Sequence, residues 1–126
     1  MSLSHRIEHD PDLLIITAEG VITQPERVAG IRGWLADPEY KPGMPTLCDF
    51  SQSQSTPTMS ELHEIVELMM HNAEAIGKKK LAVVTSKPIT HGVARQFAMF
   101  AAPLPLDIEV FPSVEQALAW LFGPER

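Results

Sequence analysis

Two polar loops, 51–58 and 86–91, contain the residue types best suited to binding an anion. Each loop leads into a segment with helical spacing, and a helix N-terminus favours phosphate or carboxylate through its free N–H groups and its dipole. An arginine one turn into the helix after loop 86–91 could bind such an anion with two hydrogen bonds. Alternatively, both loops only cap their helices and the arginine lies over the surface. The candidate ligand-binding residues are Asp49, Ser51, Ser86, His91 and Arg95.

The same residues leave an enzyme open as the alternative. Arg95 would then be the anion clamp for an acyl or phosphorylated small molecule, and Asp49 or His91 would act as acid or base. However, spacing pairs no nucleophile with a base. The chain also has no Gly-rich phosphate loop, G-x-S-x-G turn or C-x-x-C pair. The motifs therefore favour binding over catalysis, and no catalytic residue is assigned.

One series of histidine and glutamate residues has ligand types suited to zinc. His63, Glu67 and His71 stand at i, i+4 and i+8 of a predicted helix. At 1.5 Å per residue the outer two lie about 12 Å apart along the axis, so the three do not converge on one ion. We expect a solvated helix face, and neither a metal nor another cofactor.

The lone cysteine, Cys48, lies in the short apolar run 46–50. Free cysteines are among the most buried residues, so we expect Cys48 in the core. A single thiol also fits a reducing compartment, which makes the cytoplasm the expected location.

Composition and charge limit the possible partners. The 126 residues have a formal net charge of −6, which provides no long-range attraction for nucleic acid or anionic membranes. No apolar run approaches the roughly 18 to 20 residues of a membrane-spanning helix, so no integral membrane association is expected. The length is that of one domain, which we place at 1–126.

The elements that must position these residues alternate along the chain. Strand patterns at 5–10 and 13–18 flank a turn with Pro11, which predicts an antiparallel hairpin. Further strands are expected at 46–50, 80–85 and 106–111, and helices at about 23–36, 59–76, 90–102 and 113–122. The order β-β-α-β-α-β-α-β-α predicts an α/β fold with a mixed, mostly parallel sheet that begins with the hairpin.

The third predicted helix is apolar on more than one side. Its outer side carries Ala94, Ala98, Met99 and Ala102, opposite the side that covers the sheet. A helix that is apolar all round is normally buried, so this side could form a homodimer or line a site for an apolar ligand. The remaining alternative is that small alanines are partly exposed.

Several segments, taken in order, resemble one bacterial family. They are Gly20-Val21-Ile22-Thr23, Leu47-Cys48-Asp49-Phe50-Ser51, Lys80 to Val84, Gly92-Val93-Ala94-Arg95, and Val110-Phe111 followed by Glu115 to Leu121. Over nearly the whole chain they are similar to the SpoIIAA-like single-domain proteins of the STAS and Sec14 type. The resemblance implies a SpoIIAA/STAS-like fold and a regulatory or ligand-binding role without catalysis. Relatives of this kind have been regarded as binders of small, lipid-like molecules.

The resemblance also implies a position for a phosphorylation switch. STAS antagonists are phosphorylated on a serine of a D-S-S-G motif after the central strand, where this chain has Pro57-Thr58-Met59-Ser60. The Asp and Gly of the motif are absent, and Thr58 alone offers a hydroxyl at the acceptor position. Thr58 is therefore the phospho-switch candidate.

Taken together, the sequence predicts a non-catalytic STAS-like domain. Its expected partner is an unknown protein or a small amphipathic or anionic ligand, and not a nucleic acid. The expected site is near loops 51–58 and 86–91 and the third helix.

Overall fold

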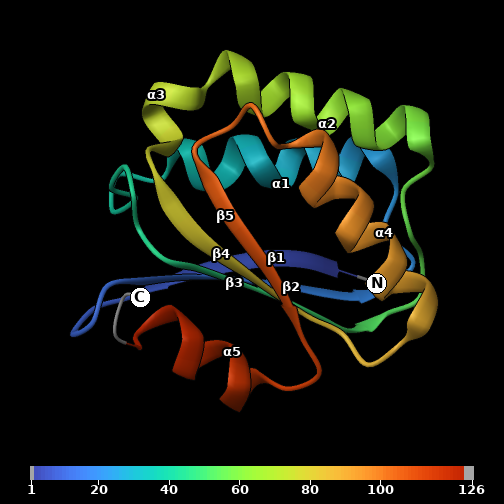
Figure 1. The fold of residues 1–126 in the computed structure, drawn as a ribbon. Coiled ribbons are helices and arrows are strands. Elements are labelled where there is room, and N and C mark those ends of the chain that lie inside the picture. The colour runs from blue at the N-terminus through green and yellow to red at the C-terminus, as the bar shows by residue number, and fades with distance from the viewer. Residues whose placement is uncertain (1, 124–126) are drawn as a thin grey trace.

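The computed structural model describes residues 2–123 and contains a mixed sheet with helices on both faces (Figure 1). The strands are β1 (Ser2–Glu8), β2 (Leu13–Gly20), β3 (Thr46–Ser53), β4 (Lys79–Val84) and β5 (Leu106–Phe111). The helices are α1 (Gln24–Ala36), α2 (Met59–His71), α3 (Ala73–Ile76), α4 (Pro88–Phe100) and α5 (Val114–Leu121).

The strands lie in the order β1-β2-β3-β4-β5. β1 pairs with β2 antiparallel, and all other neighbours pair in parallel. The predicted α/β class, N-terminal hairpin and mostly parallel sheet are confirmed. Parallel neighbours require a crossover, and the crossovers from β2 to β3, β3 to β4 and β4 to β5 contain α1, α2 with α3, and α4.

One predicted helix is divided. The segment expected as a single helix over 59–76 ends at His71 and resumes as the short α3 after Asn72. The Asn72 side chain donates to the carbonyl of Leu68 at 2.8 Å, a local bond that competes with the helical pattern. Gly77 then ends α3 with φ +76, and a Cβ there would collide with the backbone of Gly43.

Side-chain caps begin three of the helices. Thr23 and Glu26 form a capping box at the start of α1, and Thr58 and Glu61 form a second one at α2. Ser113 accepts from the backbone N–H of Gln116 at α5. These caps satisfy N–H groups that the helix itself leaves unpaired.

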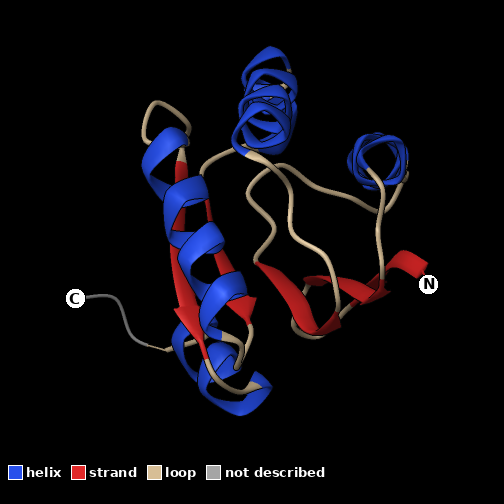
Figure 2. Cartoon of the chain, turned by 90° about the vertical axis from the view of Figure 1, so that its right-hand side faces the viewer, coloured by secondary structure: helices blue, strands red, loops and turns tan. Residues whose placement is uncertain are grey.

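The helices form unequal layers on the two faces of the sheet (Figure 2). α5 packs on β3, β4 and β5, where Ala117 and Leu121 contact Leu47, Ala82 and Val84. On the opposite face α1 lies against β1 and α4 against β5. α2 packs on α1 and α4 and stands farther from the sheet than either.

Candidate functional site

An apolar cavity of about 190 Å³ lies between the sheet and helices α1, α2 and α4. It exists because α2 bridges α1 and α4 without descending onto the strands. The residues that line it from the strands and from the loops after them are Leu3, Ser4, His5, Ile16, Ala18, Ile22, Cys48, Phe50, Ser53, Ser55, Thr56, Pro57, Leu81 and Val83. Those that line it from the helices are Arg27, Gly30, Ile31, Trp34, Leu62, Ile65, Met69, Thr90, Val93, Ala94 and Phe97.

Helical periodicity determines which side chains reach the cavity. The lining positions are 27, 30, 31 and 34 in α1, 62, 65 and 69 in α2, and 90, 93, 94 and 97 in α4. Each set follows the i, i+3, i+4, i+7 spacing of one helix face. The outer two positions of each set are seven residues apart, so at 1.5 Å per residue the cavity extends about 10 Å along each helix.

Small side chains keep the space open. Ala18 and Cys48 on the strands and Gly30 and Ala94 on the helices all line the cavity. Larger residues at Ala18, Cys48 and Ala94 would fill volume that is empty here, whereas a Cβ at Gly30 would lie 2.7 Å from the side chain of Leu3.

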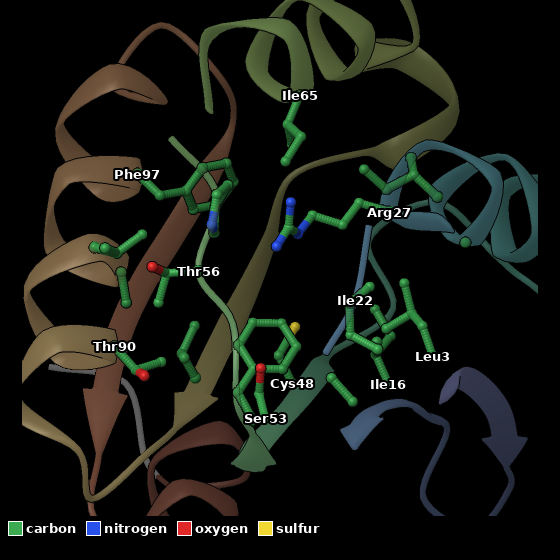
Figure 3. A pocket seen from close by; sticks show the side chains of 18 of the residues that line it. Leu3, Ile16, Ile22, Arg27, Cys48, Ser53, Thr56, Ile65, Thr90 and Phe97 are labelled. Carbon is green, nitrogen blue, oxygen red and sulfur yellow. The ribbon is translucent and has the colours of Figure 1, made fainter. Parts of the chain in front are cut away.

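Arg27 extends its guanidinium into this apolar space (Figure 3). Its side chain is only 14% exposed, and burial lowers its pKa from the usual value. An arginine remains charged in proteins despite such a shift. The cavity therefore contains a fixed positive charge at the end where α1, α2 and α4 all begin.

The bonds of Arg27 leave part of the guanidinium unpaired. Nη1 donates to Oε1 of Gln24 at 3.2 Å and lies 3.6 Å from Oε1 of Glu61. The same Glu61 oxygen accepts from the backbone N–H of Thr58 at 2.9 Å, so it is shared between two donors. Within residues 2–123, Nη2 and Nε of Arg27 have no protein acceptor.

Polar residues surround the same end of the cavity. Ser55 accepts from the backbone N–H of Ile22 at 2.8 Å, which joins the loop after β3 to the loop after β2. Lys87 donates to the carbonyl of Ser53 and so connects the ends of β4 and β3. Thr56 and Thr90 lie across the cavity from Arg27 (Figure 3). Hydrogen bonds therefore connect the loops that surround the charged end of the cavity, which we call the rim.

The far end of the cavity is closed by Trp34 and Met69. His5 also lines the wall, and its Nε2 lies 2.9 Å from Oδ2 of Asp37. Beyond the wall, Nζ of Lys79 is 4.4 Å from the centre of the Trp34 ring and 3.0 Å from the hydroxyl of Tyr40.

Buried Lys79 and half-buried Tyr40 form a polar pair beside the cavity. Burial lowers the pKa of Lys79 to about 8 and raises that of Tyr40 to about 12. The Tyr40 hydroxyl donates to the carbonyl of Ile76 at 2.7 Å, so it can accept from the lysine. This pair supports Trp34 from behind.

Cys48 is buried, as the sequence predicts, and its thiol is free. Burial raises its pKa to about 12. At neutral pH the cavity therefore contains a protonated thiol, which is a poor nucleophile.

Asp49 and Ser51 face away from the cavity. Side chains alternate along a strand, so these two share the α5 side of the sheet with Leu47. There Oδ1 of Asp49 accepts from the hydroxyl of Ser51 at 2.6 Å. The pairing of β3 with β2 gains one residue between Asp49 and Gln52, and this bulge brings Ser53 to the cavity side.

The other predicted ligand-binding residues lie elsewhere. Ser86 and His91 line a separate open depression at the ends of β4 and β5, together with Lys87. Arg95 is exposed on α4 and lines neither hollow. The structure therefore does not bring the five predicted residues together.

Thr58 and the outer side of α4 have distinct surroundings. Thr58 is exposed, and its hydroxyl accepts from the N–H of Glu61 at 3.2 Å. Met99 is 73% exposed and Ala102 is also exposed, whereas Ala98 is partly buried. Ala94 requires a correction: it lies on the inner side, packed with Cys48, Leu81 and Val83, because it belongs to the same helix face as Val93 and Phe97.

Sequence reasoning missed Arg27. The signal was present, because Arg27, Ile31 and Trp34 share one face of α1, and a charge on an apolar face is unusual. Among residues 2–123, no group of three or more potential ligands is placed to hold a metal ion, and His63 instead stacks on Phe100 at 4.3 Å. The described helices include none with the length and apolar content needed to cross a membrane.

The comparison with solved structures identifies the fold. An uncharacterised protein of the DUF3478 family from Shewanella loihica PV-4, described as having a SpoIIAA-like fold, superposes with a TM-score of 0.64. The match covers 95% of this chain and 92% of that one. The chain has a SpoIIAA-like fold. The resemblance of the sequence segments to this fold is thereby confirmed.

At 16% identity the similarity is one of fold alone. No family model matches the sequence, and no curated protein matches it. The cavity and Arg27 must therefore be interpreted from their own chemistry.

Proposed function

We propose that this SpoIIAA-like domain, residues 1–126, is a non-catalytic binding domain that takes a small amphipathic molecule into the cavity below α2. The observation that carries this proposal is the Arg27 guanidinium inside a mostly apolar cavity. A ligand with an apolar part and an anionic group complements both features.

The apolar part of such a ligand would occupy the space between the apolar walls. Inside the cavity of about 190 Å³, the apolar surfaces of the ligand and of the walls are both removed from water, which favours binding. Leu62, Ile65 and Phe97 provide its walls. Occupation by an apolar group restores the missing contacts, which favours binding.

The anionic group of the ligand would offset the charge of Arg27. A half-buried guanidinium gains from charge-assisted hydrogen bonds with an anionic partner. Arg27 has one shared carboxylate and one amide as partners. The beginnings of α1, α2 and α4 add favourable dipoles at the same end.

Binding is preferred over catalysis because the cavity offers no activated nucleophile. Its only thiol has a pKa of about 12, and the histidine that lines it is paired with Asp37. In the alternative, an enzyme with Arg95 as the clamp for an acyl or phosphorylated molecule, Arg95, Asp49 and His91 would have to approach one another. Asp49 faces the α5 side of the sheet and Arg95 lines neither hollow, which supports the binding role.

Native mass spectrometry and tryptophan fluorescence test the proposal. The Trp120→Phe protein retains Trp34 as its sole tryptophan, and Trp34 lines the cavity. We expect one of two results. Either freshly purified protein carries a small molecule in native mass spectrometry, or the addition of octanoate, octanamide or octylamine shifts the Trp34 emission. Ala94→Leu should abolish both signals, and Ala29→Leu on the exposed side of α1 should not. Absence of any bound molecule and of any shift would contradict the proposal.

A protein partner remains the second candidate, because Met99 and Ala102 leave an apolar strip on the outer side of α4. A homodimer through α4 in the cytoplasm would cover it. Light scattering after size exclusion tests this arrangement. A dimer that Met99→Glu dissociates supports it, and a monomer at all concentrations contradicts it.

A further inference from the structure

The chemistry of the cavity narrows the class of ligand. Resting on the function proposed above, we infer that the ligand is a monocarboxylic acid with a compact apolar part of about six to eight carbon atoms. Its carboxylate would bind Arg27, and its apolar part would extend toward Trp34 and Met69.

The carboxylate follows from the hydrogen bonds that Arg27 lacks. Its Nη1 is engaged by Gln24 and Glu61, whereas Nη2 and Nε have no acceptor within residues 2–123. These two groups present parallel N–H bonds in one plane, which is the geometry that a carboxylate accepts in a bidentate manner. A neutral alcohol or amide would satisfy at most one of them well.

A single negative charge fits the surroundings better than two. Among the described lining residues, Arg27 is the only lysine or arginine, and His5 is already paired with Asp37. Glu61 lies 3.6 Å from the guanidinium and would repel a second negative charge. The ammonium group of Lys87 at the rim donates to the carbonyl of Ser53, a lining residue. A phosphate monoester dianion is therefore disfavoured.

The size of the apolar part follows from the cavity. A cavity of about 150 Å³ is known to hold a benzene molecule, and this one measures about 190 Å³. Its extent of about 10 Å along each helix suits a short chain or a small ring with a side group. Trp34 and Met69 close the far end, so a long fatty acid would have to leave much of its chain outside.

The position of Glu61 also allows a ligand carboxylate to take its place beside Arg27. Its Oε1 keeps the bond to the backbone N–H of Thr58 when the distance to Arg27 increases, so α2 retains its cap. The incoming carboxylate can therefore replace Glu61 at the guanidinium without unfolding the start of α2.

Isothermal titration calorimetry with four probes tests the inference. The probes are octanoate, its neutral isostere octanamide, octyl phosphate and hexadecanoate. We expect octanoate to bind at least 10-fold more tightly than each of the others. Arg27→Met should remove the preference for octanoate over octanamide, while Arg32→Met, which changes an exposed residue of the same helix, should retain it. Thermal melting verifies that each variant folds.

Two cavity-filling variants separate the possible failures. Ala94→Leu should weaken octanoate and octanamide alike, and Ala18→Val serves if Ala94→Leu does not fold. If octanamide or octyl phosphate binds wild type as tightly as octanoate, or if Arg27→Met leaves octanoate affinity unchanged, the carboxylate class is overturned while cavity binding stands. If no probe binds wild type, the inference fails, and the proposed function fails with it when native mass spectrometry also finds no bound molecule.

Discussion

Arg27 of α1 and Glu61 of α2 face each other at 3.6 Å across the charged end of the cavity. Arg27 also lies in an apolar cavity, and Glu61 also completes the capping box of α2 with Thr58. Among residues 2–123, Arg27 is the only lysine or arginine that lines the cavity. Its contact with Glu61 therefore connects this charge to the first turn of α2, the helix that covers the cavity.

Removing the charge of Glu61 should strengthen carboxylate binding. In Glu61→Gln the amide still accepts from the Thr58 N–H, but it no longer competes for Arg27. We expect octanoate affinity to rise 3- to 10-fold in calorimetry, which corresponds to roughly 0.6 to 1.4 kcal/mol. Glu67→Gln, on the exposed side of α2, is the control and should have no effect. Equal or weaker binding by Glu61→Gln would show that Glu61 does not compete with the ligand.

Filling the cavity should stabilise the empty protein. Ala94→Leu adds carbon atoms next to space that no protein atom occupies, and cavity filling commonly adds about 0.5 to 2 kcal/mol. Urea unfolding should show this gain, whereas Ala29→Leu should change the free energy of unfolding by less than about 0.5 kcal/mol. A loss of stability in both Ala94→Leu and Ala18→Val would indicate that the cavity is not available as described.

Removing the cap of α2 should destabilise the protein without removing the binding residue. Thr58→Ala loses the acceptor for the N–H of Glu61 and should cost about 1 kcal/mol in urea unfolding. Ser60→Ala, an exposed residue of the first turn, is the matched control. If the two variants have equal stability, the Thr58 hydroxyl has no capping role. A phosphorylation switch at Thr58 remains a separate prediction, which intact mass after exposure to kinases tests.

Lys79 should make stability rise with pH just above neutrality. Its pKa falls from 10.5 when unfolded to about 8 when folded. Between these values the unfolded chain binds the extra proton, so the free energy of unfolding increases with pH, by at most about 1.4 kcal/mol per pH unit. The increase is clearest between pH 8 and 9 and should be absent in Lys79→Met. The same slope in that variant would assign the effect to another group.

Cys48 and Tyr40 should end this rise. Burial raises their pKa values from 9.0 and 10.0 to about 12, so above those unfolded values the unfolded chain loses protons that the folded protein retains. Stability should therefore level off near pH 9 and fall above pH 10. In Cys48→Ala the rise should continue to about pH 10. An unchanged profile in Cys48→Ala would contradict this assignment.

Most of the fold could be predicted from local signals. The hairpin around Pro11, the capping box of Thr23 and Glu26 and the apolar strand β4 each follow from short-range physics. The break at Asn72 could not be predicted from periodicity, because the apolar spacing continues across it to Ile76. It depends on one side-chain bond to Leu68.

The site was harder to predict because it depends on relationships between elements. Asp49 and Ser51 are adjacent in sequence to residues of β3 that line the cavity, but their side chains lie on the other face of the sheet. The bulge in β3 that turns Ser53 toward the cavity cannot be recognised from the amino-acid composition of the strand. Arg27 lies in the first turn of α1 and Arg95 in the middle of α4, and the rotation of each helix about its axis decides which of the two faces the cavity.

The most direct measurement is an isotope-filtered NOE spectrum of carbon-13-labelled protein with unlabelled octanoate. We expect contacts from the protons next to the carboxylate to the Arg27 side chain, and from the terminal methyl to Met69 and Trp34. These three residues occupy the two ends of the cavity. Contacts only to exposed residues such as Ile89 and Met99, or no contacts at saturating octanoate, would contradict binding inside the cavity.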